Sequence, residues 1–359
     1  MTNRFEIASK ITGRLKSGSV TIFDKLTAQL NYRMSRMEAD SLREQVVRRN
    51  GKAIVDRKLK QHIKNVCRQK FGSAGYWHWP ALYAEIRGEY YENWLPVDFY
   101  RFTLLPHWNL LSELSLHKTF DYKLFGAFAV KPALICIGGR YYKSSFDPLP
   151  AKEVKAFLTG VCDEVIVKPD AGRSGVGTGF YKTDQFAPEE LSKLKNFVVQ
   201  PVIKQHPELD RLSRSSVNSI RITTFMDDRS DVRLLFANQK FGMAGNRIDN
   251  LGSGGMFLRL GDDGESVTDA IGDYGSKIVE KHPVHGFRFK GFVVPAYQKA
   301  LKECIDAHKS FPYIRVIGWD VAIDEDGMPK LLEWNARRPG MWVDEALFGP
   351  LWNDNEILY

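Results

Sequence analysis

The sequence predicts an α/β protein whose first third is helical and strongly basic. Apolar residues recur every three to four positions between about Val20 and Phe71, which is the spacing of amphipathic helices. From Ser115 onward, short apolar strands alternate with helical segments. Near the end of the chain, residues 318–335 alternate in polarity around Asp326-Gly327, a favoured hairpin turn. Together these observations indicate a helical region followed by an α/β region.

Two amphipathic helices are expected in the first region, separated by a break at Asn50-Gly51. The apolar residues expected to pack lie three or four positions apart. They are Leu26, Leu30, Met34 and Met37 in the first helix, and Val55, Leu59, Ile63 and Val66 in the second. The aromatic and proline-rich stretch at 75–108 is expected to have an irregular backbone, with its rings packed between units.

The positive charge of the chain is concentrated near its start. Residues 1–70 contain 17 Lys and Arg against 6 Asp and Glu, whereas the remainder contains 34 against 37. An excess of +11 suits an anionic partner, such as a nucleic acid, an anionic membrane surface or an acidic polymer. A solvated helix face is the alternative, because the basic residues are interspersed with the periodic apolar ones. The aromatic stretch matches no nucleic-acid-binding module, so no specific nucleic acid is expected.

Composition places the chain among globular proteins, with 43% hydrophobic residues in a length of 359. No apolar run is long enough to span a bilayer, and the first residues lack the apolar core of a secretory signal, so a cytoplasmic location is expected. The widely spaced Cys67, Cys136, Cys162 and Cys304 predict reduced thiols, and neither a disulfide framework nor a zinc site.

The α/β region is expected to contain several strands and helices. They are a helical piece at 117–125, a strand at 131–137 that turns at Gly138-Gly139, a helix at 152–158, strands at 164–168, from Phe180, at 197–203, 218–225 and 232–240, and a helix at 295–308. The strand at 218–225 alternates cleanly and places Arg221 on the face opposite Ile220 and Ile222. A buried arginine in a strand usually faces an anion.

A glycine-rich loop follows the strand that ends at Lys168. Its sequence, PDAGRSGVGTGFY, places Gly172, Gly175, Gly177 and Gly179 between two strands. Such a loop can align its N–H groups along a polyphosphate, and Lys168 offers a charge to the same phosphates. The loop fits neither the Walker pattern nor the dinucleotide pattern, since no Lys-Ser/Thr and no helix follow the glycines. A hairpin tip without a ligand is the alternative.

The hairpin at 318–335 carries the candidate metal ligands. With Asp326-Gly327 as the turn, counting outward sets Asp320 opposite Glu333. Strand residues alternate faces, so Glu333 and Asn335 share a side with Asp320. Two carboxylates and an amide oxygen suit Mg²⁺ and the phosphates that it bridges. Apolar neighbours flank both carboxylates, so each of them needs a cation.

Two alternatives compete for these residues. Four residues occupy the third, fifth, sixth and twelfth positions of an EF-hand calcium loop, namely Asp324, Asp326, Gly327 and Glu333. Ala322 stands at the first position and Pro329 interrupts the loop, which disfavours Ca²⁺. The other alternative is a surface hairpin with acidic decoration.

In their order along the chain, these signals resemble the ATP-grasp superfamily, and in detail the branch of sugar-transfer-associated ATP-grasp proteins. The segments that carry the resemblance are HPEL at 206–209, VNSIRITT at 217–224, NLGSGG at 250–255, KHPVHGF at 281–287, GWDVAI at 318–323 and LLEWN at 331–335. The resemblance covers about residues 115–345. It implies an ATP-grasp fold with a small α+β lobe at 115–203 and a large lobe at 204–359, after a helical and aromatic-rich region at 1–114.

The resemblance also implies roles for individual residues. Residues implied to bind ATP are Lys118, Lys168, Gly172, Gly175 and Gly177 at the phosphates, Gln200 and Val202 near adenine, and Glu208 at the ribose. Those that match ligands of Mg²⁺ are Asp320, Glu333 and Asn335, and those that match catalytic cations are Arg221 and Lys168. Residues implied to contact the substrate are Asn218, Arg247, Asn250, Gly254 and Gly255.

The implied function is an ATP-dependent carboxylate–amine ligase. A carboxylate does not accept an amine at neutral pH, so ATP first converts it to an acyl phosphate, from which the amine displaces phosphate. A role in polysaccharide biosynthesis, with a small-molecule or glycan sugar acid or an amino acid as one substrate, is implied by the branch alone. Two alternatives stay open. One is a kinase that phosphorylates a hydroxyl, and the other is an anionic-polymer binding protein with a vestigial ATP site.

Overall fold

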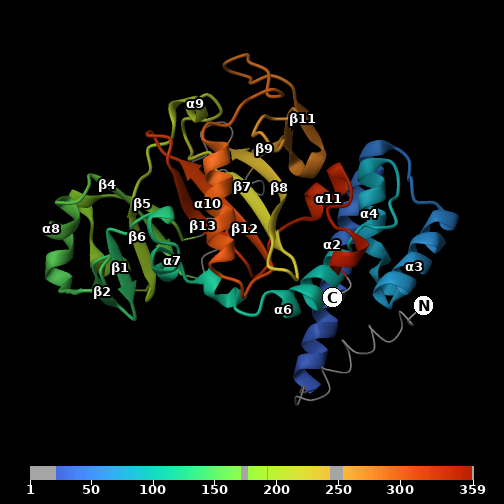
Figure 1. The fold of residues 1–359 in the computed structure, drawn as a ribbon, viewed down its shortest axis with the longest axis horizontal. Coiled ribbons are helices and arrows are strands. Elements are labelled where there is room, and N and C mark those ends of the chain that lie inside the picture. The colour runs from blue at the N-terminus through green and yellow to red at the C-terminus, as the bar shows by residue number, and fades with distance from the viewer. Residues whose placement is uncertain (1–21, 171–176, 192, 243–253, 358–359) are drawn as a thin grey trace. The chain divides into compact units, whose positions relative to one another are not determined.

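The computed structural model describes residues 22–170, 177–191, 193–242 and 254–357. It shows an α/β protein with helices and two antiparallel sheets (Figure 1). The chain divides into an N-terminal unit, Met1–Leu110 with Gly340–Tyr359, and a sheet unit, Leu111–Pro339. The expected boundary near residue 115 lies close to this division. Residues 340–359, which sequence reasoning assigned to the large lobe, group with the N-terminal unit.

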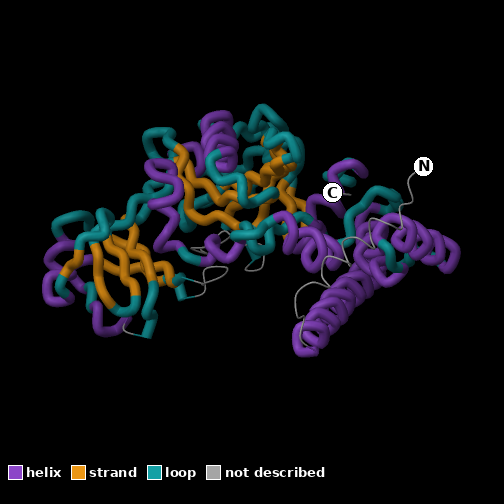
Figure 2. Tube along the Cα trace, turned by 60° about the horizontal axis from the view of Figure 1, so that its bottom comes forward, coloured by secondary structure: helices purple, strands orange, loops and turns teal. Residues whose placement is uncertain are grey.

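The N-terminal unit is helical throughout most of its described length (Figure 2). Its helices are α2 (Ile22–Asn50), α3 (Arg57–Phe71), η1 (Ala74–Trp77), α4 (His78–Arg87), α5 (Val97–Phe99), the π-helical turn η2 (Tyr100–Leu104), α6 (Leu105–Trp108), α11 (Trp342–Phe348) and α12 (Asp354–Ile357). The break predicted at Asn50-Gly51 is confirmed. Asp56 then starts α3 by accepting a hydrogen bond from the Leu59 amide, and Gly72 ends it with a left-handed φ of 79°.

The first helix is confirmed, but its predicted packing face is wrong. Leu30, Met34 and Met37 are exposed, whereas Ser35 and Ala39 are buried. Periodic spacing shows that apolar residues share one stripe, but it does not show which stripe of a long helix faces inward. Here the inward stripe consists of small side chains, which let α2 approach α4 closely.

The aromatic stretch at 75–108 is largely helical, so the prediction of an irregular backbone is wrong. Its prolines begin helices instead of breaking them, since Pro96 precedes α5 and Pro106 lies in the first turn of α6. The rings pack inside the N-terminal unit, where the Tyr83 ring lies 6.3 Å from Trp79 and 5.4 Å from Trp94, between ring centroids.

The sheet unit contains two sheets in which every paired strand is antiparallel (Figures 1 and 2). The six-stranded sheet has the order β3-β2-β1-β6-β4-β5 and consists of β1 (Leu134–Ile137), β2 (Arg140–Tyr142), β3 (Pro148–Leu149), β4 (Glu164–Pro169), β5 (Gly179–Lys182) and β6 (Phe197–Pro201). The seven-stranded sheet has the order β11-β10-β9-β8-β7-β12-β13 and consists of β7 (Ile220–Met226), β8 (Val232–Phe241), β9 (Met256–Leu260), β10 (Ala270–Gly272), β11 (Lys277–Val279), β12 (Val316–Ile323) and β13 (Pro329–Asn335).

Helices and helical turns connect these strands. They are η3 (Ser112–Leu116), η4 (Lys118–Phe120), α7 (Asp121–Phe125), η5 (Gly126–Phe128), η6 (Ala151–Glu153), α8 (Val154–Thr159), η7 (Thr183–Gln185), η8 (Pro188–Leu191), α9 (Pro207–Asp210), η10 (Asp273–Gly275) and α10 (Tyr297–Lys309). The elements predicted from sequence for this region are therefore present. None of the helices in the described part of the chain is long and apolar enough to cross a bilayer. The four cysteines are free thiols, as predicted.

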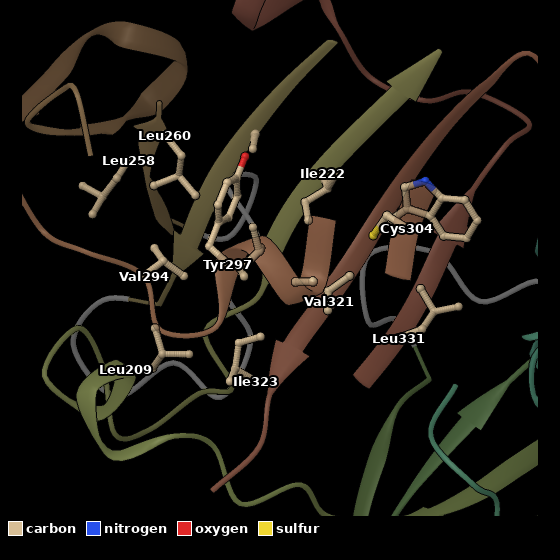
Figure 3. Close-up of a cluster of buried hydrophobic side chains, with 14 of the residues drawn as sticks. Leu209, Ile222, Leu258, Leu260, Val294, Tyr297, Cys304, Val321, Ile323 and Leu331 are labelled. Carbon is tan, nitrogen blue, oxygen red and sulfur yellow. The ribbon is translucent and has the colours of Figure 1, made fainter. Parts of the chain in front are cut away.

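The main core lies on one face of the seven-stranded sheet, beneath α10 (Figure 3). Tyr297 and Cys304 of α10 are buried with Ile222 of β7 and Val321 of β12. Strand residues alternate faces, so Arg221 and Asp320 must point to the opposite face of the sheet. Burial of the apolar face thus leaves a polar face for chemistry.

A chain of hydrogen bonds fixes α10 to the apolar face of this sheet. Trp319 Nε1 donates to Thr224 Oγ1 at 2.9 Å, and Thr224 Oγ1 lies 2.7 Å from His308 Nδ1. His308 Nε2 lies 2.8 Å from the Ile314 carbonyl oxygen. The chain is satisfied when neutral His308 donates from Nε2 and accepts at Nδ1. Burial accordingly lowers the pKa of His308 to about 4.

We predict that stability falls as the pH decreases from about 6.5 toward 4. The folded state holds His308 neutral while the unfolded chain protonates it near its ordinary pKa, so protons favour unfolding in this window by up to about 3 kcal/mol. Urea unfolding of His308→Gln should show a shallower pH dependence there than the wild-type chain. An unchanged dependence would show that another group controls acid unfolding.

Candidate active site

The β12–β13 hairpin sets the candidate ligands opposite one another, as sequence counting predicted. Gly318 pairs with Asn335 and Asp320 pairs with Glu333. Trp319 and Trp334 pair between them and point into the core, where their rings stack at 6.5 Å between centroids. The register at the site is therefore confirmed.

The predicted two-residue turn is wrong. Asp324 pairs with Met328 around a three-residue loop that ends at Gly327, whose φ is 73°. Asp324 Oδ1 stabilises this loop by accepting from the amides of Asp326 and Met328, at 3.2 and 2.7 Å. The register recovers because a bulge at Leu332 inserts one extra residue into β13 before the site. Flanking strands and a capping role for Asp324 also argue against the EF-hand alternative.

Asp320 is the centre of the polar face. It is buried, and Arg221 on the neighbouring strand β7 binds it in bidentate geometry, with Nε donating to Oδ1 at 2.9 Å and Nη2 to Oδ2 at 2.8 Å. Asn335 Nδ2 donates to Oδ2 at 3.2 Å. The anion that the strand arginine was predicted to face is thus Asp320.

Lys240 is a second cation on Asp320 that sequence reasoning missed. Its Nζ lies 2.8 Å from Asp320 Oδ1. The signal was present in the β7–β8 pairing, since Arg221 pairs with Asn238 and a residue two positions along β8 shares the same face. Burial by itself raises the pKa of Asp320, but Arg221 and Lys240 outweigh that effect and hold the pKa well below its usual range.

Two further cations approach the site from the segment before β1 and from β4. Lys118 Nζ lies 3.7 Å from Glu333 Oε1. Lys168 is half-buried, and desolvation lowers its pKa to about 8, with Glu333 opposing and Lys118 reinforcing that shift. Asp170, two residues beyond Lys168, accepts from Thr119 N at 3.0 Å and from Thr119 Oγ1 at 2.9 Å. This contact ties the backbone beside Lys118 to the end of the strand that carries Lys168.

Asp121 is a buried carboxyl that sequence reasoning also missed. Trp334 Nε1 donates to its Oδ1 at 2.9 Å. Burial raises the pKa of Asp121 to about 8, although Trp334, Lys118 and Lys168 oppose the shift. At neutral pH this group is mainly protonated and supplies little negative charge to the site.

Among the described residues, the charges gathered at this site are more positive than negative. Four cations, Lys118, Lys168, Arg221 and Lys240, lie near two carboxylates, Asp320 and Glu333. Uncompensated charge is costly where water is excluded, so such a site is stabilised by an anionic ligand. Several phosphate groups would satisfy this requirement.

Comparison of the sequence with known protein families identifies the family of this chain. A family model described as sugar-transfer associated ATP-grasp matches residues 149–351, which is more than half of the chain. The chain belongs to this ATP-grasp family. Its fold class, predicted from the resemblance, is confirmed. No curated protein matches the chain at a significant level.

Several solved structures match the chain at low identity. The biotin carboxylase domain of Hydrogenobacter thermophilus 2-oxoglutarate carboxylase, in complex with MgADP, ADP and bicarbonate, is 13% identical, with a TM-score of 0.38 over 63% of this chain and 40% of that chain. Biotin carboxylase from Campylobacter jejuni is 10% identical, with a TM-score of 0.43 over 69% and 47%. The D-alanine-D-alanine ligase from Coxiella burnetii is 11% identical, with a TM-score of 0.40 over 69% and 58%. The chain spans less than two thirds of each, and these scores carry no argument about the reaction.

The residues that the ATP-grasp resemblance assigns to adenine and ribose lie outside the charged cluster. Gln200 is buried on β6, where its Nε2 donates to the Val130 carbonyl at 3.1 Å, and its Oε1 has no hydrogen-bond partner among the described residues. Val202 follows β6 and donates its amide to the Glu164 carbonyl at 3.3 Å. Glu208 on α9 is exposed and pairs with Arg211 at 2.7 Å. Their nucleotide roles stay predictions.

The residues assigned to the substrate are not gathered by the described structure. Asn218 is fully buried and donates its Nδ2 to Gln205 Oε1 and to the carbonyls of Leu209 and Ser213. Arg247, Asn250, Gly172 and Gly175 lie outside the described residues. Gly177 and Gly254 have left-handed φ values of 79° and 82°, and Gly255 directly precedes β9.

We predict strong energetic coupling between Asp320 and Lys240. Removing either partner leaves a buried charge uncompensated, so a double-mutant cycle of Asp320→Asn and Lys240→Met in urea should give about 2–3 kcal/mol of coupling. The matched control is the exposed pair Lys302 and Asp306 on α10, changed to Met and Asn, whose coupling should be too small to measure. Equal coupling in the two cycles would contradict the central place of Asp320.

Proposed function

We propose that this ATP-grasp protein is a ligase that uses ATP and Mg²⁺ to join a carboxylate to an amine. The observation that carries the proposal is the surplus of cations, among the described residues, around the carboxylates of Asp320 and Glu333. Phosphoryl transfer depends mainly on positioned charge, and a site that is positive before the ligand arrives stabilises the charge of ATP without reorganisation.

The four cations divide into two pairs by their contacts. Lys118 and Lys168 come from the lobe that carries the glycine-rich loop, and we assign them to the phosphates, with Gly172, Gly175 and Gly177 as the lid. Arg221 and Lys240 are held by Asp320, and we assign them to the transferred phosphoryl group. The bidentate contact orients the Arg221 guanidinium, so Asp320 acts on the reaction through Arg221.

The hairpin residues fit Mg²⁺. Glu333 is partly exposed, and among the described residues its ion pair is the long one to Lys118. Asn335 uses its amide nitrogen on Asp320, so oxygen atoms of both Glu333 and Asn335 can face a cation. Mg²⁺ commonly takes one or two protein oxygens and completes its shell with water and phosphate. No group of three His, Cys, Asp or Glu side chains suited to a metal occurs in the described part of the chain, which is consistent with this sparse set. When bound, the ion supplies positive charge to the phosphate oxygens.

The proposed chemistry has two balanced steps. A substrate carboxylate oxygen attacks the γ-phosphorus of ATP, so an acyl phosphate forms and ADP leaves. The amine nitrogen then attacks the acyl carbon, phosphate leaves and the amine loses a proton.

Transfer to a hydroxyl, which would make the protein a kinase, needs the same cations. The proposal includes an adenine contact by Gln200 and Val202 and a ribose contact by Glu208. It also includes substrate contacts by Asn218, Arg247, Asn250, Gly254 and Gly255. A cytoplasmic location and a sugar acid or amino acid as substrate belong to the same proposal.

The test of this function is a screen of ADP release with sugar acids and amino acids offered in pairs. ADP release that requires both a carboxylate and an amine, with an amide product in mass spectrometry, supports a ligase. A phosphate ester formed from a hydroxyl substrate would instead establish a kinase. ATP that binds without turnover against any pair would favour a vestigial site.

We predict that Glu333→Gln lowers ATP turnover at least about a hundredfold, because the site loses a charge that faces Mg²⁺ and Lys118. The fold should persist, since Glu333 is partly exposed and its ion pair is long. The matched control is Glu325→Gln in the loop of the same hairpin, where the side chain is exposed and lies 3.9 Å from Lys204. Normal turnover by the Glu333 variant, with unchanged magnesium dependence, would remove Glu333 from the site.

A second prediction follows from the pKa of Lys168, which burial lowers to about 8. Below this pH the ammonium is charged in the free protein and binds phosphate, whereas above it ATP must restore a proton. ATP affinity should therefore fall as the pH rises through about 8, by up to tenfold per pH unit. Calorimetry of Lys168→Arg should show affinity that is independent of pH in this range, because guanidinium stays charged. Parallel pH profiles would argue against a phosphate contact for Lys168.

A further inference from the structure

Helix α2 is anchored through one face. Ser35 and Ala39 are buried on that face, and Ser35 Oγ accepts a hydrogen bond from Trp79 Nε1 of α4 at 3.0 Å. Val46 continues the same buried stripe two turns later. These contacts define the inner face of the helix.

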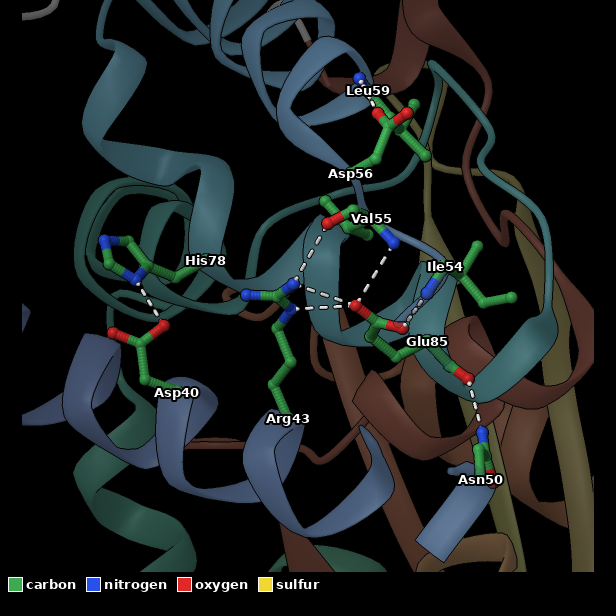
Figure 4. Close-up of polar contacts among 9 residues, drawn as sticks. All are labelled: Asp40, Arg43, Asn50, Ile54, Val55, Asp56, Leu59, His78 and Glu85. Atoms are coloured by element: carbon green, nitrogen blue, oxygen red, sulfur yellow. Dashed lines mark hydrogen bonds and ion pairs between the residues drawn. The ribbon is translucent and has the colours of Figure 1, made fainter. Parts of the chain in front are cut away.

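Polar contacts lock the helix in this orientation (Figure 4). The buried carboxylate of Glu85 on α4 accepts from Arg43 of α2 at 2.9 and 3.1 Å, and from the amides of Ile54 and Val55 at 2.6 and 3.2 Å. Asn50 at the end of α2 donates to the Glu85 carbonyl at 3.3 Å. Rotation of α2 to bury another face would remove the contacts of Arg43 and Asn50 with Glu85, which is costly.

The opposite face of α2 carries an apolar stripe. Leu30, Met34 and Met37 are 55%, 60% and 61% exposed. Spacings of four and three residues place these side chains next to one another on the helix surface. We call Leu30, Met34 and Met37 the outer stripe. Large apolar side chains gathered in this way on an exposed helix mark an interaction surface.

The part of the chain that contains α2 and α3 is basic, since residues 22–71 contain 13 Lys and Arg against 5 Asp and Glu. Arg33 is exposed on α2 four residues before Met37, so the two side chains are neighbours on the helix surface. The acids in the second half of α2 are already engaged, Glu38 by Arg101 at 3.3 Å, Asp40 by His78 at 2.8 Å and Glu44 by Arg48 at 3.2 Å. Helix α3 has six Lys and Arg and no Asp or Glu in its 15 residues.

A shallow groove of about 540 Å³ adjoins the stripe. Its lining consists of Gln29, Tyr32, Arg33, Arg36, Met37, Asp40 and His78. Arg36 pairs with Asp98 and Asp40 pairs with His78. The cationic Arg33 and the apolar Met37 therefore flank the same hollow, one turn apart on one helix.

We propose that the outer face of α2 docks onto an anionic phospholipid bilayer. A hydrophilic polyanion would satisfy the cations but would leave Leu30, Met34 and Met37 in water. A bilayer surface offers lipid phosphates to the cations and an acyl boundary to the stripe, so it matches both features. The proposal concerns the N-terminal unit and is independent of the proposed ligase activity.

The test is sedimentation of the full chain with vesicles, one set made of phosphatidylcholine and another of equal parts phosphatidylcholine and phosphatidylglycerol. We expect binding to the anionic set that weakens as salt rises above about 0.1 M, because exposed charges are then screened. The triple variant Leu30→Ser, Met34→Ser, Met37→Ser should partition at least about tenfold less. The three positions are exposed, so this variant is expected to fold, and circular dichroism checks that it does.

A matched control replaces three exposed aliphatic residues of the sheet unit, as Val161→Ser, Ile278→Ser and Val284→Ser. This variant should bind vesicles like the wild-type chain. A third variant, Arg33→Gln, Arg49→Gln, Lys52→Gln, should bind less and with a weaker salt dependence. ATP turnover should be unchanged in all three, so a failure of docking leaves the ligase proposal intact.

Several results would overturn the proposal. Undiminished binding by the triple serine variant would show that the stripe does not enter the bilayer. Absence of vesicle binding with retention on inorganic polyphosphate would assign the basic surface to a hydrophilic polyanion. Absence of vesicle binding with a change of mass in light scattering for the serine variant would assign the stripe to self-association.

Discussion

The structure of the polar face depends on the burial of one carboxylate, Asp320. A buried carboxylate costs several kcal/mol unless cations and hydrogen-bond donors compensate it. Here the compensation comes from three other strands, through Arg221 of β7, Lys240 of β8 and Asn335 of β13. A slip of one residue in any of these pairings would turn a partner to the apolar face. Charge pairing and core packing therefore select the same register.

The same arrangement explains how the site comes to be positive. Asp320 requires compensation by charge, and Arg221 and Lys240 together bring two positive charges to its one negative charge. Lys118 and Lys168 add two more against Glu333, while burial keeps Asp121 mainly protonated. The site is thus organised before a ligand arrives, and the depressed pKa of Lys168 reflects the cost of that organisation. An anion with several charges relieves the cost, which links the stability of the empty site to its affinity for phosphate.

Sequence reasoning located the main residues of this site because alternation in a strand is a strong signal. Asp320, Glu333 and Asn335 followed from one hairpin, and Arg221 from another strand. The predicted pairing of Asp320 with Glu333 is correct partly because two differences from the predicted hairpin cancel. The loop has three residues instead of two, and the bulge at Leu332 restores the register. A bulge has no reliable sequence signal, because it reflects the competition of Leu331, Leu332 and Trp334 for the core. The sequence did not indicate a role for Lys240, because that role depends on the pairing of β8 with β7, which the sequence of either strand alone does not show.

The inward face of α2 was also beyond sequence reasoning, for a related reason. A long helix can carry two apolar stripes, and the choice between them is made by its neighbours. Here Glu85 and Trp79 of α4 select the stripe with small residues, because only that stripe brings Arg43 and Ser35 within hydrogen-bonding distance. The larger apolar stripe is consequently displaced to the surface.

The charges around Asp320 and the charges on α2 and α3 differ in their response to ionic strength. Arg221 and Lys240 each lie 2.8 Å from the buried carboxylate of Asp320, so ionic strength has little access to them. Cations on α2 and α3 are mostly exposed, and their attraction for a distant surface is screened within about 10 Å at ordinary salt. Salt therefore separates the two regions, since it weakens association at the helices and leaves the electrostatics of the sheet site largely unchanged. The proposed docking of α2 and the proposed binding of ATP are therefore expected to respond differently to ionic strength.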